Sequence, residues 1–172
     1  MVAANYPVTV VNNVNTQIIP LRKGNNLFST YLIPTNAKVD IVMQALVAQN
    51  ALYKVQDEAG NSYQYWGTYG GWINKIGSIA ETEGYNIKVN FNCTLQITGQ
   101  MIVLPLAIPL KKGWNIISYP RKDQVNAMYI IQSLIDQNRL VKVQDELGNS
   151  IQYIKGNGWV NNIGNLQSWS GI

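Results

Sequence analysis

The residues able to do acid–base chemistry in this 172-residue chain are a few carboxylates, because the sequence contains no His. Without His it lacks the usual general base near neutral pH and the commonest transition-metal ligand. The candidates are the pairs Asp57-Glu58 and Asp145-Glu146, together with Glu81 and Glu83. A glycosidase-type hydrolase needs two carboxylates facing each other across a cleft. Each Asp-Glu pair precedes a Gly-Asn turn, where carboxylates bond backbone donors, so we expect a structural role. A hydrolase that uses Asp57, or Glu81 with Glu83, is kept as a minor alternative.

The other chemical groups predict no catalytic, metal or cofactor site. Cys93 is the only Cys and has no His to activate it, so we expect a small buried hydrophobic residue rather than a nucleophile. The Asp-Glu turns lack the alternating oxygen ligands of a calcium loop, and no Gly-rich phosphate loop is present. We therefore expect a protein that is not an enzyme and that has no cofactor.

The composition narrows the choice of partner. Only 13% of the residues are charged, about half the roughly 25% of an ordinary soluble domain. Asn and Gln instead account for 34 residues, so the polar surface is largely neutral. The net charge is +4, and the basic residues lie in scattered pairs rather than in the single stripe typical of nucleic-acid binders. No run of about 18 apolar residues occurs. We expect no nucleic-acid partner and no membrane insertion.

An internal repeat organises the sequence. Ile19–Gly24 recurs as Ile108–Gly113, and Lys54-Val55-Gln56-Asp57-Glu58 recurs unchanged at 142–146. A Trp-x-Asn-x-Ile-Gly motif begins at both Trp72 and Trp159. The offset between the matches falls only from 89 to 87 residues over the whole stretch. We interpret the chain as a tandem duplication.

Each copy predicts the same order of elements, β-β-α-β-β-β-β, an α+β module. Apolar residues at i, i+3, i+4, i+7 and i+8 from Val39, and again from Ala127, predict one buried helix face in each copy. Thr35 and Asp123 are the expected N-caps. A hairpin over 52–65 alternates, which places Tyr53, Val55, Tyr63 and Tyr65 on one face of the sheet.

The second copy ends early. We assign residues 18–106 to copy one and residues 107–172 to a truncated copy two, in which the last strands of copy one have no counterpart. The N-terminal segment, residues 1–17, contains Tyr6-Pro7-Val8-Thr9-Val10, which is similar to Tyr85-Asn86-Ile87-Lys88-Val89. We expect residues 6–17 to complete copy two, in cis or from a neighbouring molecule, because open sheet edges recruit strands. The alternative is a remnant of a preceding copy in a longer array.

Deleting residues 1–17 is therefore expected to lower the melting temperature or to change the oligomeric state. Calorimetry and gel filtration measure both quantities. An unchanged melting temperature together with an unchanged elution volume would contradict the prediction.

The aromatic residues are the remaining candidates for a binding site. Tyr65, Trp66 and Tyr69 lie in a Gly-rich loop, where aromatic faces could cover the C–H face of a sugar while amides bond its hydroxyl groups. Trp114, Tyr119 and Trp169, found only in copy two, form an equivalent candidate set. Trp72 and Trp159 occur in both copies and are expected to pack in the core. The alternative for the aromatic loop is contact with protein.

Residues 112–120 (Lys-Gly-Trp-Asn-Ile-Ile-Ser-Tyr-Pro), 159–164 and 84–89 together resemble a tandem Gly-Trp-Asn-x-Ile-Ser repeat module of secreted and cell-surface bacterial proteins. Copy one departs from this pattern at residues 25–29. The resemblance implies an extracellular or cell-surface location and a non-catalytic role, although residues 1–5 have no export signal of their own. It supplies no catalytic residues.

The sequence therefore favours a secreted or surface module that binds or adheres, with glycan as the expected ligand. The alternative is a structural spacer or assembly module whose open sheet edges pair with neighbouring proteins.

Overall fold

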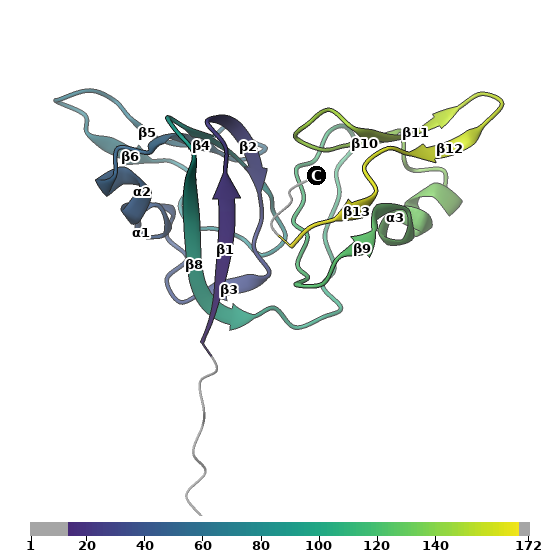
Figure 1. The fold of residues 1–172 in the computed structure, drawn as a ribbon, viewed down its shortest axis with the longest axis horizontal. Helices are drawn as coiled ribbons and strands as arrows, with labels where there is room; N and C mark the ends of the chain where they lie inside the picture. Colours follow the sequence, from purple (N-terminus) through teal and green to yellow (C-terminus); the bar gives the residue numbers. More distant parts are fainter. Residues whose placement is uncertain (1–13, 169–172) are drawn as a thin grey trace, which may run out of the picture.

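A computed structural model describes residues 14–168 as a β-rich α+β protein with three helices in that range. The described chain forms two lobes, which lie side by side in Figure 1. We call residues 14–101 the N-terminal lobe, residues 117–168 the C-terminal lobe, and residues 102–116 the connecting segment. Each lobe has its own hydrophobic core.

Two antiparallel sheets build the N-terminal lobe. The smaller sheet has the order β1-β8-β3, and the larger has the order β2-β7-β4-β5-β6, so β7 lies between β2 and β4. The strands are β1 (Asn15–Leu21), β2 (Gly24–Phe28), β3 (Leu32–Pro34), β4 (Leu52–Gln56), β5 (Ser62–Tyr65), β6 (Trp72–Asn74), β7 (Tyr85–Val89) and β8 (Cys93–Met101).

The predicted first helix forms as two short helices, α1 (Val39–Val42) and α2 (Gln44–Ala48), which are separated at Met43. Val39, Met43 and Leu46 are at most 1% exposed, which confirms the predicted apolar face. The expected cap is wrong. Thr35 bonds Thr98 of β8, and the helix begins later because the chain first forms a bridge between Lys38 and Ser78.

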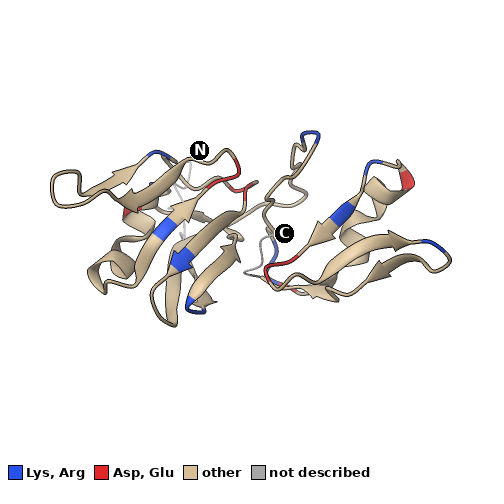
Figure 2. Ribbon diagram, turned by 90° about the horizontal axis from the view of Figure 1, so that it is seen from above, with Lys and Arg blue, Asp and Glu red and all other residues tan. Residues whose placement is uncertain are grey.

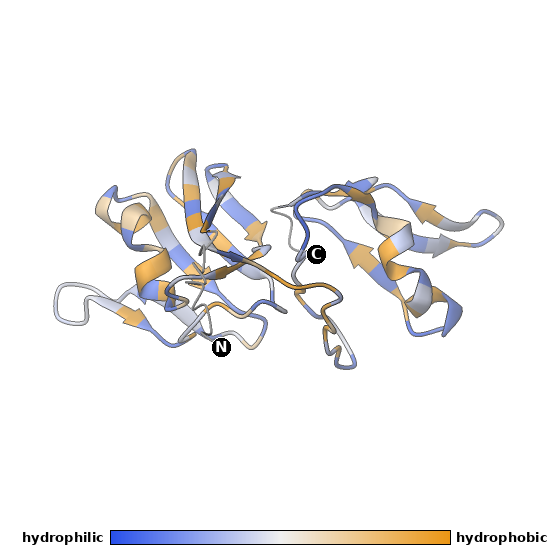
Figure 3. Cartoon of the chain, turned by 90° about the horizontal axis from the view of Figure 1, so that it is seen from below, coloured by the Kyte–Doolittle hydropathy of each residue, from blue (hydrophilic) through white to orange (hydrophobic). Residues whose placement is uncertain are grey.

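The N-terminal core brings together residues from both sheets and both helices. Its sixteen buried members come from most of the strands, and β7 alone supplies Tyr85, Ile87 and Val89. Figure 3 shows hydrophobic and hydrophilic residues alternating along strands of this lobe. Hydrophobic burial at this meeting point holds the two sheets together.

The C-terminal lobe is smaller. A three-stranded sheet has the order β10-β11-β12, and a second pair joins β13 to β9. Asn126 caps the helix by accepting a hydrogen bond from the backbone amide of Met128 (2.9 Å), so the expected cap at Asp123 is wrong. The elements are β9 (Val125–Asn126), α3 (Ala127–Asp136), β10 (Lys142–Gln144), β11 (Ser150–Ile154), β12 (Gly158–Asn161) and β13 (Asn165–Leu166).

The predicted element order is wrong at the start of this half. Residues 102–124 contain no strand, only an isolated bridge between Glu83 and Ile117. In the N-terminal lobe, β1 is held by β8 and β2 is held by β7. The described residues after β13 supply no strand that could hold residues 108–110 or 113–117 in the same way.

The N-terminal segment also differs in part from the prediction. Asn15–Gln17, which we expected to complete copy two, extend β1 and pair with residues 97–99 of β8. The Gln17 side chain does reach the C-terminal lobe, since its Nε2 donates to the carbonyl of Ser168 (2.7 Å). Residues 6–13 lie outside the described residues, so that part of the expectation stays a prediction.

The hairpin of β4 and β5 has the predicted turn, but two residues expected on its inner face, Tyr53 and Tyr65, are exposed. The pairing of β4 with β7 shifts between Leu52 and Lys54. Leu52 is therefore buried, while Tyr53, which was expected on the inner face, is 55% exposed. A bulge of this kind turns a side chain from one face of a sheet to the other.

Replacing Leu46 with Ala tests the role of α2 in the N-terminal core. We expect Leu46→Ala to lower the free energy of unfolding by about 2–5 kcal/mol, because it leaves a cavity among buried side chains. Ile41→Ala, at a 44% exposed position of α1, is the matched control and should cost less than about 1 kcal/mol. Urea unfolding followed by circular dichroism measures both. Equal losses would mean that α2 does not anchor this core.

Candidate functional site

An open hollow of about 550 Å³ lies in the N-terminal lobe, beside strands β4, β5 and β6 of the five-stranded sheet. Aromatic rings and side-chain amides surround it, and none of its lining residues is charged. These residues are Asn50, Leu52, Tyr53, Gln64, Tyr65, Trp72 and Asn90.

The aromatic wall of the hollow combines one anchored ring with two exposed rings. Trp72 is half-buried and packs against the core, with its ring centroid 5.0 Å from that of buried Tyr63. Tyr65 lies opposite Trp72 in the sheet, with a centroid distance of 6.0 Å and 53% of its surface exposed. The core thus fixes Trp72, and Trp72 in turn supports Tyr65.

Tyr53 reaches the hollow because of the bulge in β4. Lys88 of β7 places its Nζ 4.5 Å from the centroid of the Tyr53 ring, a cation–π contact. Such a contact holds the ring without covering its other face. Reasoning from the sequence missed Tyr53, since strict alternation along β4 assigns this residue to the core.

Side-chain amides form the polar part of the hollow. Asn90 Nδ2 donates to the backbone carbonyl of Asn50 (2.8 Å), which ties the end of β7 to the start of β4. Asn50 has a positive φ of 56°, a conformation that Asn tolerates better than most residues. Gln64 completes the set. Each amide offers both a donor and an acceptor, so together they can bond a ligand rich in hydroxyl groups.

Of the predicted site residues that lie within the described range, one lines this hollow. Tyr65 lines it, whereas Trp66 and Tyr69 lie in the adjoining loop, which closes through a hydrogen bond from the Trp66 amide to the Gly71 carbonyl (2.8 Å). Trp66 is 54% exposed, with Lys75 Nζ 5.4 Å from its ring centroid, and Tyr69 is fully exposed. These two side chains stand apart from the amides.

The candidates in the second half do not join the hollow. Trp114 is 74% exposed on a turn of the connecting segment, which the Asn115 side chain closes through bonds to Lys111. Tyr119 is buried in the C-terminal core, so its place in the candidate set was wrong. Trp169 lies outside the described residues. Trp159 is half-buried as expected, and its ring centroid lies 6.1 Å from that of exposed Tyr153.

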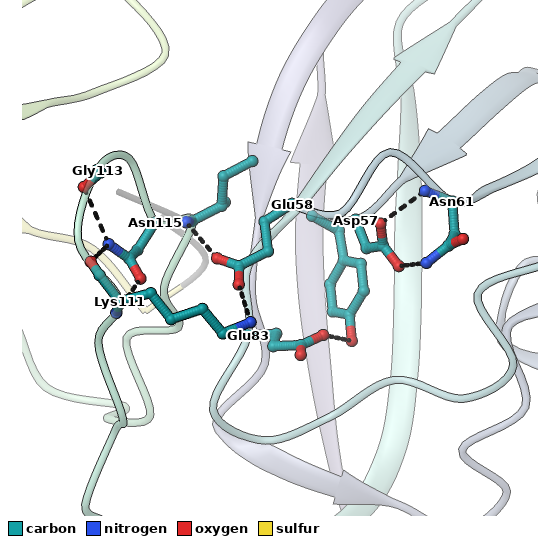
Figure 4. A network of polar contacts seen from close by, with 9 residues as sticks. Asp57, Glu58, Asn61, Glu83, Lys111, Gly113 and Asn115 are labelled. Atoms are coloured by element: carbon teal, nitrogen blue, oxygen red, sulfur yellow. Dashed lines mark hydrogen bonds and ion pairs between the residues drawn. The ribbon is translucent and has the colours of Figure 1, made fainter.

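The Asp residues of the two Asp-Glu pairs bond their own turns, which confirms that expectation. Both oxygens of Asp57 accept from Asn61, one from the backbone amide and one from Nδ2, each at 2.8 Å (Figure 4). Asp145 accepts from Asn149 in the same way at the same distances. All of these carboxylate oxygens are therefore engaged in holding a turn.

The Glu residues of the same pairs connect the two halves of the chain. Glu58 Oε2 accepts from the amide of Ile116 (3.3 Å), and its Oε1 lies 3.5 Å from Lys111 Nζ (Figure 4). In the reverse direction, Glu146 Oε2 accepts from the amide of Leu27 (2.8 Å). The two contacts are reciprocal, since each half offers a carboxylate to the backbone of the other.

Two further chemical candidates, Glu83 and Cys93, are also held in structural contacts. Tyr85 donates its hydroxyl to Glu83 (3.1 Å), and burial, with the Glu83 carboxylate nearby, raises the pKa of this tyrosine well above its usual value. Burial also raises the pKa of the Cys93 thiol, which packs against the N-terminal core. A raised pKa leaves less of the reactive thiolate.

Charged residues are dispersed over the described part of the chain (Figure 2). Lys and Arg are spread over both lobes in Figure 2. Within residues 14–168, no group of three or more Cys, Asp or Glu side chains could hold a metal ion. No helix in that range is long and apolar enough to cross a membrane. Comparisons of the chain with protein-family models, curated proteins and solved structures gave no match.

The reciprocal carboxylates can be tested by amide hydrogen exchange. We expect Glu58→Ala to speed exchange at Ile116, and Glu146→Ala to speed exchange at Leu27, each at least tenfold, because each variant removes the acceptor of that amide. Asp136→Ala, on exposed α3, is the control. NMR-detected exchange resolves the two amides. Unchanged rates in both variants would show that these bonds do not hold the halves together.

Proposed function

We propose that this protein is a non-catalytic binding module, and that the hollow bounded by Tyr53, Tyr65 and Trp72 takes a glycan. The observation that carries this proposal is the combination of exposed aromatic faces and side-chain amides around one hollow whose lining residues are uncharged. It also rests on the sparse charge of the whole chain.

The chemistry of sugars suits this arrangement. One face of a pyranose ring carries C–H groups that pack on aromatic rings, while its hydroxyl groups need donors and acceptors at the ring edge. Tyr53 and Tyr65 offer exposed faces, and Gln64 with the two Asn residues offers amides. An open hollow fits part of a chain of sugars better than a small molecule that must be enclosed.

We further propose that the two lobes are copies of one module. Matched contacts support the duplication. The Val39 amide donates to the Gly77 carbonyl as the Ala127 amide donates to that of Gly164. Asn74 and Asn161 bond the two loops that follow them in the same manner.

A second, weaker site follows from the duplication. Tyr153, Trp159 and Gln152 occupy the positions of Tyr65, Trp72 and Gln64. Val141 stands where Tyr53 stands in the first copy, so one aromatic wall is missing. We infer that the N-terminal lobe carries the main site. The resemblance to secreted bacterial repeat modules adds an extracellular or cell-surface location to the proposal.

A glycan array followed by titration calorimetry tests the proposed site. We expect Tyr53→Ala and Tyr65→Ala each to weaken binding of the best array ligand about tenfold, since an aromatic face contributes on the order of 1 kcal/mol. Tyr129→Ala, at a 79% exposed position on α3, is the matched control and should leave affinity unchanged.

The array also separates the hollow from the neighbouring loop. A loss of binding in Trp66→Ala and Tyr69→Ala, with Tyr53→Ala unaffected, would move the site to the loop. An absence of binding to any glycan on the array would contradict the proposed function.

A further inference from the structure

The edge of β10 is open in the C-terminal lobe, whereas the corresponding edge in the N-terminal lobe is filled. β4 pairs with β5 on one side and with β7 on the other. β10 pairs with β11 alone among the described strands and lies at the edge of its sheet. An edge strand presents unpaired backbone groups that can bond another strand.

Side chains beside this edge are less buried than their counterparts. Val55 of β4 is fully buried, whereas its counterpart in β10, Val143, is 9% exposed. Leu52 is 4% exposed, whereas its counterpart, Leu140, is only half-buried. Val141, next to the edge, is 87% exposed. The C-terminal core contains six buried residues against sixteen in the N-terminal lobe. The edge is therefore bordered by apolar surface that one more strand would cover.

We propose that the β10 edge binds residues 6–10 of a second copy of this chain as an added antiparallel strand. The sequence Tyr6-Pro7-Val8-Thr9-Val10 repeats the apolar positions of β7, Tyr85-Asn86-Ile87-Lys88-Val89, which fills the same place in the N-terminal lobe. The alternation buries Tyr6, Val8 and Val10 on one face. Pro7 costs one backbone hydrogen bond, which a strand near its first residue tolerates.

A second copy suits this place better than the segment's own chain. β1 runs its full length from Asn15, and Figure 1 shows β10 level with the far end of β1. The segment's own chain would have to return along β1, which at about 3.3 Å per residue is some 23 Å long. The five Cα–Cα steps from Val10 to Asn15 span at most about 18 Å, which is less than the length of β1.

The pairing of β4 with β7 fixes the expected register. Lys54 lies opposite Lys88, and Val55 lies opposite Ile87. The same register places Thr9 of one chain opposite Lys142 of the other. Directly opposed residues of antiparallel strands have Cα atoms about 4.5–5.5 Å apart, a separation that a disulfide bridges.

Disulfide trapping between two differently labelled full-length chains tests the proposal. One chain carries Thr9→Cys and the other, labelled with ¹⁵N, carries Lys142→Cys, both with Cys93→Ala to remove the native thiol. Under mild oxidation we expect a mixed disulfide dimer, identified by mass spectrometry of the linked peptide. The control chain carries Tyr129→Cys in place of Lys142→Cys, at a position that is more exposed than Lys142. The yield of the mixed dimer should be at least tenfold higher with Lys142→Cys than with this control.

A register control and an apolar control make the result specific. Val10→Cys should link poorly to Lys142→Cys, because adjacent residues of a strand face opposite sides. Val8→Asp should reduce self-association of the otherwise unchanged chain in sedimentation velocity, while Asn12→Asp should not. A mixed dimer no more abundant than with Tyr129→Cys would overturn the proposal. A third chain carries both Thr9→Cys and Lys142→Cys. If the disulfide forms only within single molecules of that chain, the proposal is overturned as well.

Discussion

A strand in the middle of a sheet needs a partner on each side, and in this protein β7 meets that constraint for the N-terminal lobe. It joins β2 to β4 and contributes Tyr85, Ile87 and Val89 to the core. The described C-terminal lobe has no strand in that place. Its smaller core, the lack of strands over residues 102–124 and the open edge of β10 all follow from this difference.

The two halves hold each other mainly through carboxylates that accept backbone amides, and Glu58 also forms an ion pair with Lys111. Glu58 and Glu146 come from matching turns, and each accepts a backbone amide from the other half. In the same turns, the preceding Asp residues bond Asn side chains. A chain so poor in charge thus uses its few carboxylates to fix turns and to join its halves, while neutral amides and aromatic rings make up the candidate binding surface.

Reasoning from the sequence succeeded where local patterns determine structure. The 3.6-residue spacing predicted the buried helix face of the first copy and, except for exposed Ile130, that of the second. The Asp-x-x-Gly-Asn order predicted the capped turns. It failed where the structure depends on pairing between strands that are distant in the sequence. The bulge that exposes Tyr53 depends on the register with β7, and the hollow joins Asn50 to Asn90 across the sheet. The strands expected at the start of the second half do not form, and no described strand pairs with that stretch as β8 and β7 pair with β1 and β2.

Hydrogen exchange at β10 as a function of protein concentration tests most directly the claim that this edge is completed by a second chain. Some backbone amides of residues 141–143 are not bonded to β11. The account predicts that these amides exchange more slowly as the protein concentration rises from about 10 μM to about 1 mM. Amides that face β11 should keep their rates. Rates at the open edge that do not depend on concentration would contradict the claim.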